Sequence, residues 1–168
     1  MVLLVKSEGK CAIALGSNLG KTRATLEAAL TTLAATPEIM LLARSSWYQT
    51  KAVGPPQPDY INGCALLQVK ISHLMLLETL LAVEAQFGRV RRERWGARSL
   101  DLDLLLYDDL ILSTSTLTLP HPRMRERAFV LVPLAQIAPD WIEPVSGMAI
   151  AQLVQAVDCS GVNRLISP

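Results

Sequence analysis

The chain has 168 residues, of which 51% are hydrophobic, and its formal net charge at pH 7 is +1. This length and composition predict one globular domain with an ample core, and the small net charge argues against a nucleic-acid binder with a broad basic surface. Its three cysteines form no Cys-x-x-Cys pair, so we expect neither zinc nor a disulfide framework, but a cytoplasmic protein. No apolar run is long enough to span a membrane. We also expect a monomer, because no apolar stripe is left over for an interface.

The first half of the chain alternates apolar runs with one helical pattern. Residues 1–10 are interpreted as an N-terminal extension, either a flexible tail or a start-site choice, ahead of a single domain over 11–168. The expected strands cover residues 11–15, 39–48 and 60–71. Between the first two strands, spaced leucines predict a helix that ends at Thr36-Pro37, with Ser17 or Asn18 as its N-cap. The segment 51–59 contains three prolines and predicts a loop.

A second helix is predicted to begin after Ser72 as N-cap and to close at Gly88. Its apolar side is expected to comprise Leu77, Leu80, Leu81 and Phe87. An arginine-rich loop follows over 89–98, and the apolar residues after it predict a strand over 99–107.

The end of the chain has weaker patterns. Residues 125–137 have a helical pattern that Pro133 interrupts, and residues 149–157 predict a last short helix. The order of the preceding elements is strand, helix, strand, strand, helix, strand. This βαββαβ order predicts an α+β, ferredoxin-like antiparallel sheet with helices on one face and C-terminal additions.

The most informative motif is Asp101-Leu102-Asp103 on the strand predicted over 99–107. Residues two apart on a strand face the same side, with their Cα atoms about 6.5 to 7 Å apart. Two carboxylates so close raise each other's pKa unless a cation lies between them. A lone Asp-x-Asp is more often a solvated face. The apolar residues after Asp103, however, predict a central strand whose polar end reaches a cleft.

The loop over 89–98 adds positive charge beside these aspartates. It contains five arginines and a single acid, Glu93. The loop could simply be solvated, but one carboxylate cannot neutralise five guanidinium groups, and guanidinium forks suit phosphate oxygens. An exposed Trp95 would leave a large apolar ring in water at a cost in free energy, which suggests that the loop closes over a flat ligand. Carboxylates able to hold Mg²⁺ next to such a loop favour a polyphosphate site.

The run from Gly16 to Thr22 follows a strand and opens a helix, as a phosphate-binding P-loop does. However, three residues separate its two glycines, whereas the P-loop pattern requires four. We therefore interpret it as a tight turn with a helix cap.

Three further residues have chemistry suited to a ligand. Tyr60 and Asn62 share one face of a strand, where they could stack on a heterocycle and read its edge, although from these residues alone ordinary strand packing is the better explanation. His121 lies between two prolines, near Arg123, Arg125 and Arg127, and is either a phosphate donor or a surface histidine.

Together, four ordered motifs resemble the 6-hydroxymethyl-7,8-dihydropterin pyrophosphokinase family. They cover residues 12–18, 58–62, 94–105 and 120–134. The chain departs from the usual pattern at Gln49, at Lys51-Ala52 and at Ala97.

This resemblance implies a ferredoxin-like enzyme that transfers pyrophosphate from ATP to the dihydropterin and releases AMP, using two Mg²⁺ ions. It implies that Asp101 and Asp103 hold both ions. The residues implied to contact ATP are Glu84, Arg89, Arg98, His121 and Arg127, with Arg89 and Arg98 also steadying the transferred charge. For the pterin, the resemblance implies stacking between Tyr60 and Phe129, a hydrogen bond from Asn62, and closure by Trp95.

Two other hypotheses stay open at this point. A ferredoxin-like nucleotidyltransferase also places paired aspartates on its sheet, but it would release pyrophosphate and would leave Tyr60 and Asn62 unexplained. A non-enzymatic RNA-binding or regulatory module would use the arginine loop, would bind oligonucleotides with a steep salt dependence and would not need Asp101 or Asp103.

Overall fold

The computed structural model describes residues 7–52, 56–88 and 99–166 of the chain. Its main sheet contains β1 (Gly9–Ser17), β2 (Ile39–Arg44), β3 (Tyr48–Thr50), β4 (Tyr60–Val69), β5 (Asp101–Tyr107) and β10 (Val162–Arg164). The helices are α1 (Thr22–Ala34), α2 (His73–Gln86), α3 (Ala128–Ile137) and α4 (Ile150–Gln155), with a 3₁₀ turn η1 (Met124–Glu126). Two small hairpins complete the fold, β6 (Leu112–Ser113) with β7 (Thr118–Leu119) and β8 (Ile142–Glu143) with β9 (Met148–Ala149).

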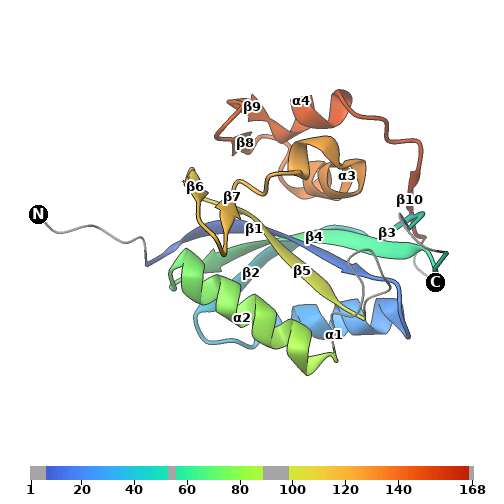
Figure 1. Cartoon of the computed structure of the whole chain (residues 1–168), viewed down its shortest axis with the longest axis horizontal. Coiled ribbons are helices and arrows are strands. Elements are labelled where there is room, and N and C mark those ends of the chain that lie inside the picture. Colours follow the sequence, from blue (N-terminus) through green and yellow to red (C-terminus); the bar gives the residue numbers. More distant parts are fainter. Residues whose placement is uncertain (1–6, 53–55, 89–98, 167–168) are drawn as a thin grey trace, which may run out of the picture.

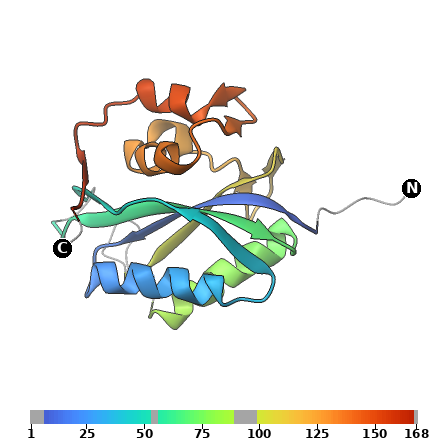
Figure 2. The same cartoon turned by 180° about the vertical axis from the view of Figure 1, so that it is seen from behind.

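The sheet confirms the predicted ferredoxin-like arrangement. Its order is β10-β3-β4-β1-β5, with β2 also paired to β4, and every pairing is antiparallel. The prediction that helices cover one face was incomplete. Helices α1 and α2 pack on one face, whereas the C-terminal segment brings α3 and α4 onto the other (Figures 1 and 2).

The two layers of helices bury both faces of the central strands. In β1, Cys11, Ile13 and Leu15 belong to the core under α1 and α2, while Ala12 belongs to the core under α3 and α4. Because side chains alternate across a strand, such two-sided burial requires a nearly continuous apolar run. This explains why β1 is so apolar, and it holds the middle of the sheet rigid beneath the site.

The strand predicted over 39–48 is interrupted and becomes β2 and β3, both on the same edge of β4. Ser45 leaves the ladder, where its hydroxyl accepts from the Cys64 N–H at 2.9 Å. Trp47 packs flat on Gly63, so closely that a Cβ at Gly63 would lie 2.5 Å from the indole ring. The indole N–H donates to Glu27 on α1 at 2.8 Å. Burial of this tryptophan therefore outweighs continuation of the strand.

Some expected helix details differ as well. The cap predicted for α1 was wrong, because the N-cap is Lys21 and makes no side-chain hydrogen bond. Ser72 does cap α2, accepting from the Met75 N–H at 3.2 Å, and Gly88 follows the helix with φ +78°. Of the apolar residues expected on this helix, Leu81 is 44% exposed. The buried face of α2 consists of Leu76, Leu80, Val83 and Glu84.

Strand β1 begins at Gly9, so the last residues of the expected 1–10 extension are paired with β4. Residues 1–6 lie outside the described residues. No helix in the described part of the chain has the length and apolar character needed to cross a membrane.

Candidate active site

The two aspartates of β5 lie at the start of the strand and share one face, as predicted. Asp101 pairs with Gly16 of β1 and Asp103 pairs with Ala14. On the opposite face, Leu100, Leu102 and Leu104 are buried in the core under α1 and α2. The strand is thus anchored by its leucines, while both carboxylates point toward the other side and line a cavity of about 630 Å³.

That cavity collects seven of the residues that the sequence singled out. They are Tyr60, Asn62, Asp101, Asp103, His121, Arg127 and Phe129. They come from β4, from β5 and from the segment that runs from the end of β7 into α3. The antiparallel register places β4 and β5 on either side of β1, so a small ligand over β1 can touch all three groups.

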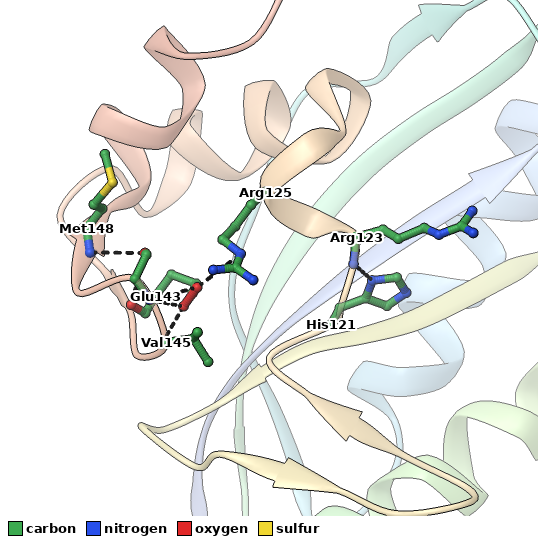
Figure 3. A network of polar contacts seen from close by, with 7 residues as sticks. His121, Arg123, Arg125, Glu143, Val145 and Met148 are labelled. Carbon is green, nitrogen blue, oxygen red and sulfur yellow. Dashed lines mark hydrogen bonds and ion pairs between the residues drawn. The ribbon is translucent and has the colours of Figure 1, made fainter.

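His121 is held in one orientation by its backbone neighbours. The backbone N–H of His121 donates to the Leu105 carbonyl at 2.9 Å. The backbone N–H of Arg123 donates to the ring Nδ1 of His121 at 3.2 Å (Figure 3). Because Nδ1 accepts, the neutral ring carries its proton on Nε2, which lies 4.0 Å from the Asp103 carboxylate.

The charge state of His121 follows from its surroundings. Its pKa is lowered to about 4, mainly by burial and also by the positive charges of Arg127 and Arg123, against an opposite effect of Asp101. At neutral pH the imidazole is therefore uncharged, and its contact with Asp103 is not a salt bridge. Its Nε2–H is available as a hydrogen-bond donor that faces the cavity.

Asn62 presents a defined edge to the same cavity. Its side-chain carbonyl accepts a hydrogen bond from the Thr50 hydroxyl, so its amide N–H groups are the donors left for a ligand. The amide nitrogen lies beside Gly16, where a Cβ would come within 3.1 Å of it. Thr50 was not singled out in the sequence, although its alternation with Tyr48 on a strand beside Asn62 could have indicated it.

Phe129 lies at the first turn of α3 on another side of the cavity. The guanidinium carbon of Arg127 lies 5.4 Å from the centre of its ring, close enough for a cation–π contact. Aromatic surface and positive charge are thus adjacent at this wall.

The arginines after His121 divide between two directions. Arg123 and Arg127 line the cavity together with Glu126, which sequence reasoning missed. Arg125 points instead toward the β8–β9 hairpin, where its Nε lies 3.4 Å from Glu143 (Figure 3). Three-residue spacing in a 3₁₀ turn brings Arg123 and Glu126 onto one side, and that signal could have indicated Glu126.

Glu84 lies outside the described cavity lining and is almost completely buried on α2. Its carboxylate accepts from the Leu102 N–H at 2.7 Å, so it holds the residue between the two aspartates. The observed contact of the Glu84 carboxylate is therefore with the backbone of β5. The expected contact of Glu84 with ATP stays a prediction.

The turn that resembles a P-loop ties together the loops around the cavity. Ser17 donates to the Ser99 carbonyl at 2.5 Å, and Ser99 in turn donates to the Phe87 carbonyl at 2.9 Å. Asn18 donates to the Gln57 side chain at 2.7 Å and to the Pro58 carbonyl at 3.0 Å. These two residues, predicted as helix caps, are buried loop anchors.

Other expected site residues lie outside the described residues, namely Arg89, Trp95 and Arg98. Their roles stay predictions. Among residues 7–52, 56–88 and 99–166, no three His, Cys, Asp or Glu side chains gather in a way that could hold a metal ion. The role of Asp101 and Asp103 as metal ligands stays a prediction.

The chain was compared with known proteins. A family model described as 7,8-dihydro-6-hydroxymethylpterin-pyrophosphokinase (HPPK) matches residues 12–139. A Synechocystis protein named 2-amino-4-hydroxy-6-hydroxymethyldihydropteridine pyrophosphokinase is 53% identical over 150 residues, which cover 89% of this chain and 77% of that protein. A Pseudomonas aeruginosa protein of the same name is 44% identical over 154 residues, covering 91% and 94% of the two chains.

Solved structures agree in fold. The crystal structure of wild-type Plasmodium falciparum HPPK-DHPS with pteroate matches with a TM-score of 0.70 at 10% identity. The match covers 93% of this chain but only 43% of that one, so the present chain spans less than half of its length. At this identity the likeness shows the fold alone.

Proposed function

The chain belongs to the 7,8-dihydro-6-hydroxymethylpterin-pyrophosphokinase family of folate biosynthesis, and we propose that it transfers pyrophosphate from ATP to the hydroxymethyl group of 6-hydroxymethyl-7,8-dihydropterin. The products are AMP and the pterin diphosphate. One observation carries this proposal: a single cavity of about 630 Å³ is lined by paired carboxylates, by basic groups suited to phosphate and by an aromatic and amide wall suited to a heterocycle.

The carboxylate pair suits magnesium. Asp101 and Asp103 supply hard oxygen ligands from one face of β5, and in the described residues they are not part of a larger protein ligand cluster. Mg²⁺ in enzymes that act on nucleotides is commonly held by one or two carboxylates plus water and substrate phosphates, so this donor set fits. When bound, two such ions would neutralise the negative charge of the triphosphate, including the charge on the pyrophosphoryl group that is transferred.

The basic groups would bind and orient the nucleotide. His121 would donate its Nε2–H to a phosphate oxygen, and Arg127 would add a guanidinium beside it. A neutral imidazole whose Nδ1 already accepts is a donor here and not a general base. Arg89 and Arg98 would supply further charge for the transfer, because phosphoryl-type reactions depend mainly on positioning and neutralisation.

The other wall would select the pterin. Tyr60 and Phe129 both line the cavity and would stack on the pterin, and Asn62 would present its amide N–H groups to ring acceptors. Trp95 would cover the bound pterin and keep water from the activated phosphorus.

The identity of the nucleotide product tests this proposal. The protein is mixed with ATP, Mg²⁺ and 6-hydroxymethyl-7,8-dihydropterin, and the nucleotides are separated by chromatography. AMP that forms only with pterin present supports pyrophosphate transfer. ADP would mean a single phosphoryl transfer, and free pyrophosphate with a nucleotidylated pterin would mean a nucleotidyltransferase. No turnover by folded protein would favour the binding-module hypothesis.

We further propose that the protein acts as a cytoplasmic monomer. Its three cysteines are all free thiols, and burial raises the pKa of Cys11 to about 12, so this thiol is unreactive at neutral pH. Free thiols are typical of a reducing compartment. Sedimentation analysis at micromolar concentration should give the mass of one chain, and a mass twice as large would contradict this proposal.

A further inference from the structure

The turn η1 stands between the cavity and the β8–β9 hairpin. Its flanking residues Arg123 and Arg127 line the cavity, whereas Arg125 within it points the other way (Figure 3). The Nε of Arg125 lies 3.4 Å from the Glu143 carboxylate at the end of β8. One short turn therefore connects the C-terminal hairpin to two guanidinium groups of the site.

Glu143 is an unusual residue for a short hairpin because its side chain is 0% exposed. Its carboxylate accepts from the Val145 N–H at 2.6 Å and from the Ser146 N–H at 3.1 Å. A buried carboxylate is tolerated only when hydrogen bonds and an opposite charge compensate for lost hydration. The backbone donors hold the anion in place within the hairpin, and Arg125 supplies the positive charge.

Backbone hydrogen bonds hold the turn, among them one in which the Glu126 N–H donates to the Arg123 carbonyl at 3.1 Å. The Met124 N–H donates to the His121 carbonyl at 3.2 Å, and the Arg127 N–H donates to the Met124 carbonyl at 3.3 Å, which is long for such a bond. The Met124 side chain is buried in the core under α3 and α4. Hydrogen-bond geometry in a 3₁₀ turn is poorer than in an α-helix. A contact from outside therefore matters to where its flanking arginines point.

We propose that Arg125 and Glu143 form a positioning pair, which orients η1 so that Arg123 and Arg127 face the phosphate groups of a bound nucleotide. The pair touches no substrate, and its effect on the nucleotide passes through the turn. This inference rests on the proposed function, because it takes the nucleotide to be bound beside Arg127.

The test compares nucleotide affinity with pterin affinity in variants of the pair. Arg125→Met keeps much of the side-chain volume but removes the charge, and Arg125→Lys keeps the charge. A non-hydrolysable ATP analogue with Mg²⁺ and, separately, 6-hydroxymethyl-7,8-dihydropterin are titrated by calorimetry. We expect Arg125→Met to weaken nucleotide binding about fivefold, in the range of couplings between contacting residues. Pterin binding should stay within about twofold of native, and Arg125→Lys should restore most of the nucleotide affinity.

A second variant, on the other member of the pair, keeps the test valid if Arg125→Met does not fold. Glu143→Gln keeps one oxygen that can accept from the Val145 and Ser146 N–H groups and replaces the charged oxygen that faces Arg125, so it should weaken nucleotide binding as Arg125→Met does. The double variant should be no worse than either single one, because both remove the same contact. Glu27→Gln serves as the matched control, since it removes an ion pair with Arg44 on the other face of the sheet.

Failure of the positioning role and failure of the proposed function give different outcomes. Native nucleotide affinity in folded Arg125→Met and Glu143→Gln would overturn the positioning role while leaving the function intact. Equal weakening of both ligands, or additive effects in the double variant, would also overturn it. If the native protein bound neither ligand, the proposed function itself would fail.

Discussion

At the scale of single residues, we expect substitution of the carboxylates of β5 to have the largest effect on turnover. Asp103→Asn keeps the shape of the side chain but removes the negative charge that would hold magnesium, so turnover should fall at least about tenfold. Steady-state AMP formation measures this, with circular dichroism to show that the variant folds. Asp158→Asn is the matched control, because Asp158 is exposed and lies far along the chain from the cavity lining. Activity of Asp103→Asn above a tenth of the native value would contradict the metal assignment.

The contact between Thr50 and Asn62 gives a second residue-scale prediction. Thr50→Val is nearly isosteric and removes the hydroxyl that donates to the Asn62 side-chain carbonyl. Without that donor the amide can rotate, so pterin affinity should fall about tenfold, as expected for loss of a buried hydrogen bond of 1 to 1.5 kcal/mol. Titration calorimetry with each substrate checks this. A loss of ATP affinity of the same size would show that Thr50 supports the whole cavity instead of the pterin edge.

His121 makes the stability of the protein depend on pH. Its folded pKa of about 4 lies below the ordinary histidine value of 6.5, so between these values the unfolded chain binds more protons than the folded one. Its contribution is therefore intact above pH 6.5 and is lost as the pH falls toward 4. Urea unfolding at pH 7 and pH 5 should show that the native protein loses about 1 to 2 kcal/mol more than His121→Asn. Equal losses in both proteins would mean that His121 titrates normally in the folded state.

At the scale of elements, the interruption between β2 and β3 depends on one close contact. A Cβ at Gly63 would lie 2.5 Å from the Trp47 ring, which is itself held by Glu27. Gly63→Ala should therefore push the indole out of place and destabilise the fold by about 1 to 3 kcal/mol. Gly161→Ala is the control, since nothing lies within 4 Å of a Cβ there. Thermal unfolding of the two variants measures the difference, and equal melting temperatures would refute the role of the contact.

The elements also show what sequence reasoning can reach. The order of the elements was predictable because β1 and β5 are nearly continuous apolar runs, buried over most of their length, and the two main helices lie between strands with clear ends. The break at Trp47 was not predictable, because it depends on Gly63, on another strand. The same reason applies to Ser17 and Asn18, whose partners lie far along the chain. Local patterns therefore indicated the elements, while contacts between distant residues decided their ends.

The candidate site follows the same rule. Asp101 and Asp103 could be paired from spacing alone, because two residues apart on a strand always share a face. That Arg125 would turn away from Arg123 and Arg127 depends on Glu143, which is eighteen positions later and has no recognisable motif around it. Roles that need a partner from another element were therefore the ones that the sequence left open.

At the scale of the whole molecule, the sheet separates two kinds of structure. Helices α1 and α2 build a core on one face, and η1, α3, α4 and the β8–β9 hairpin form the other side with the cavity at their edge (Figures 1 and 2). The central claim is that this cavity brings ATP and a pterin together so that two phosphates move as one unit. Its two walls are consistent with that reaction, because one is charged and the other aromatic.

The most direct measurement follows the β-phosphorus of ATP. The protein is given ATP labelled with ³²P at the β position, Mg²⁺ and 6-hydroxymethyl-7,8-dihydropterin, and the label is located after separation of the products. The account predicts that the label moves to the pterin and that the AMP formed is unlabelled. Label retained in ADP, or released as free pyrophosphate, would contradict the transfer of an intact pyrophosphate group.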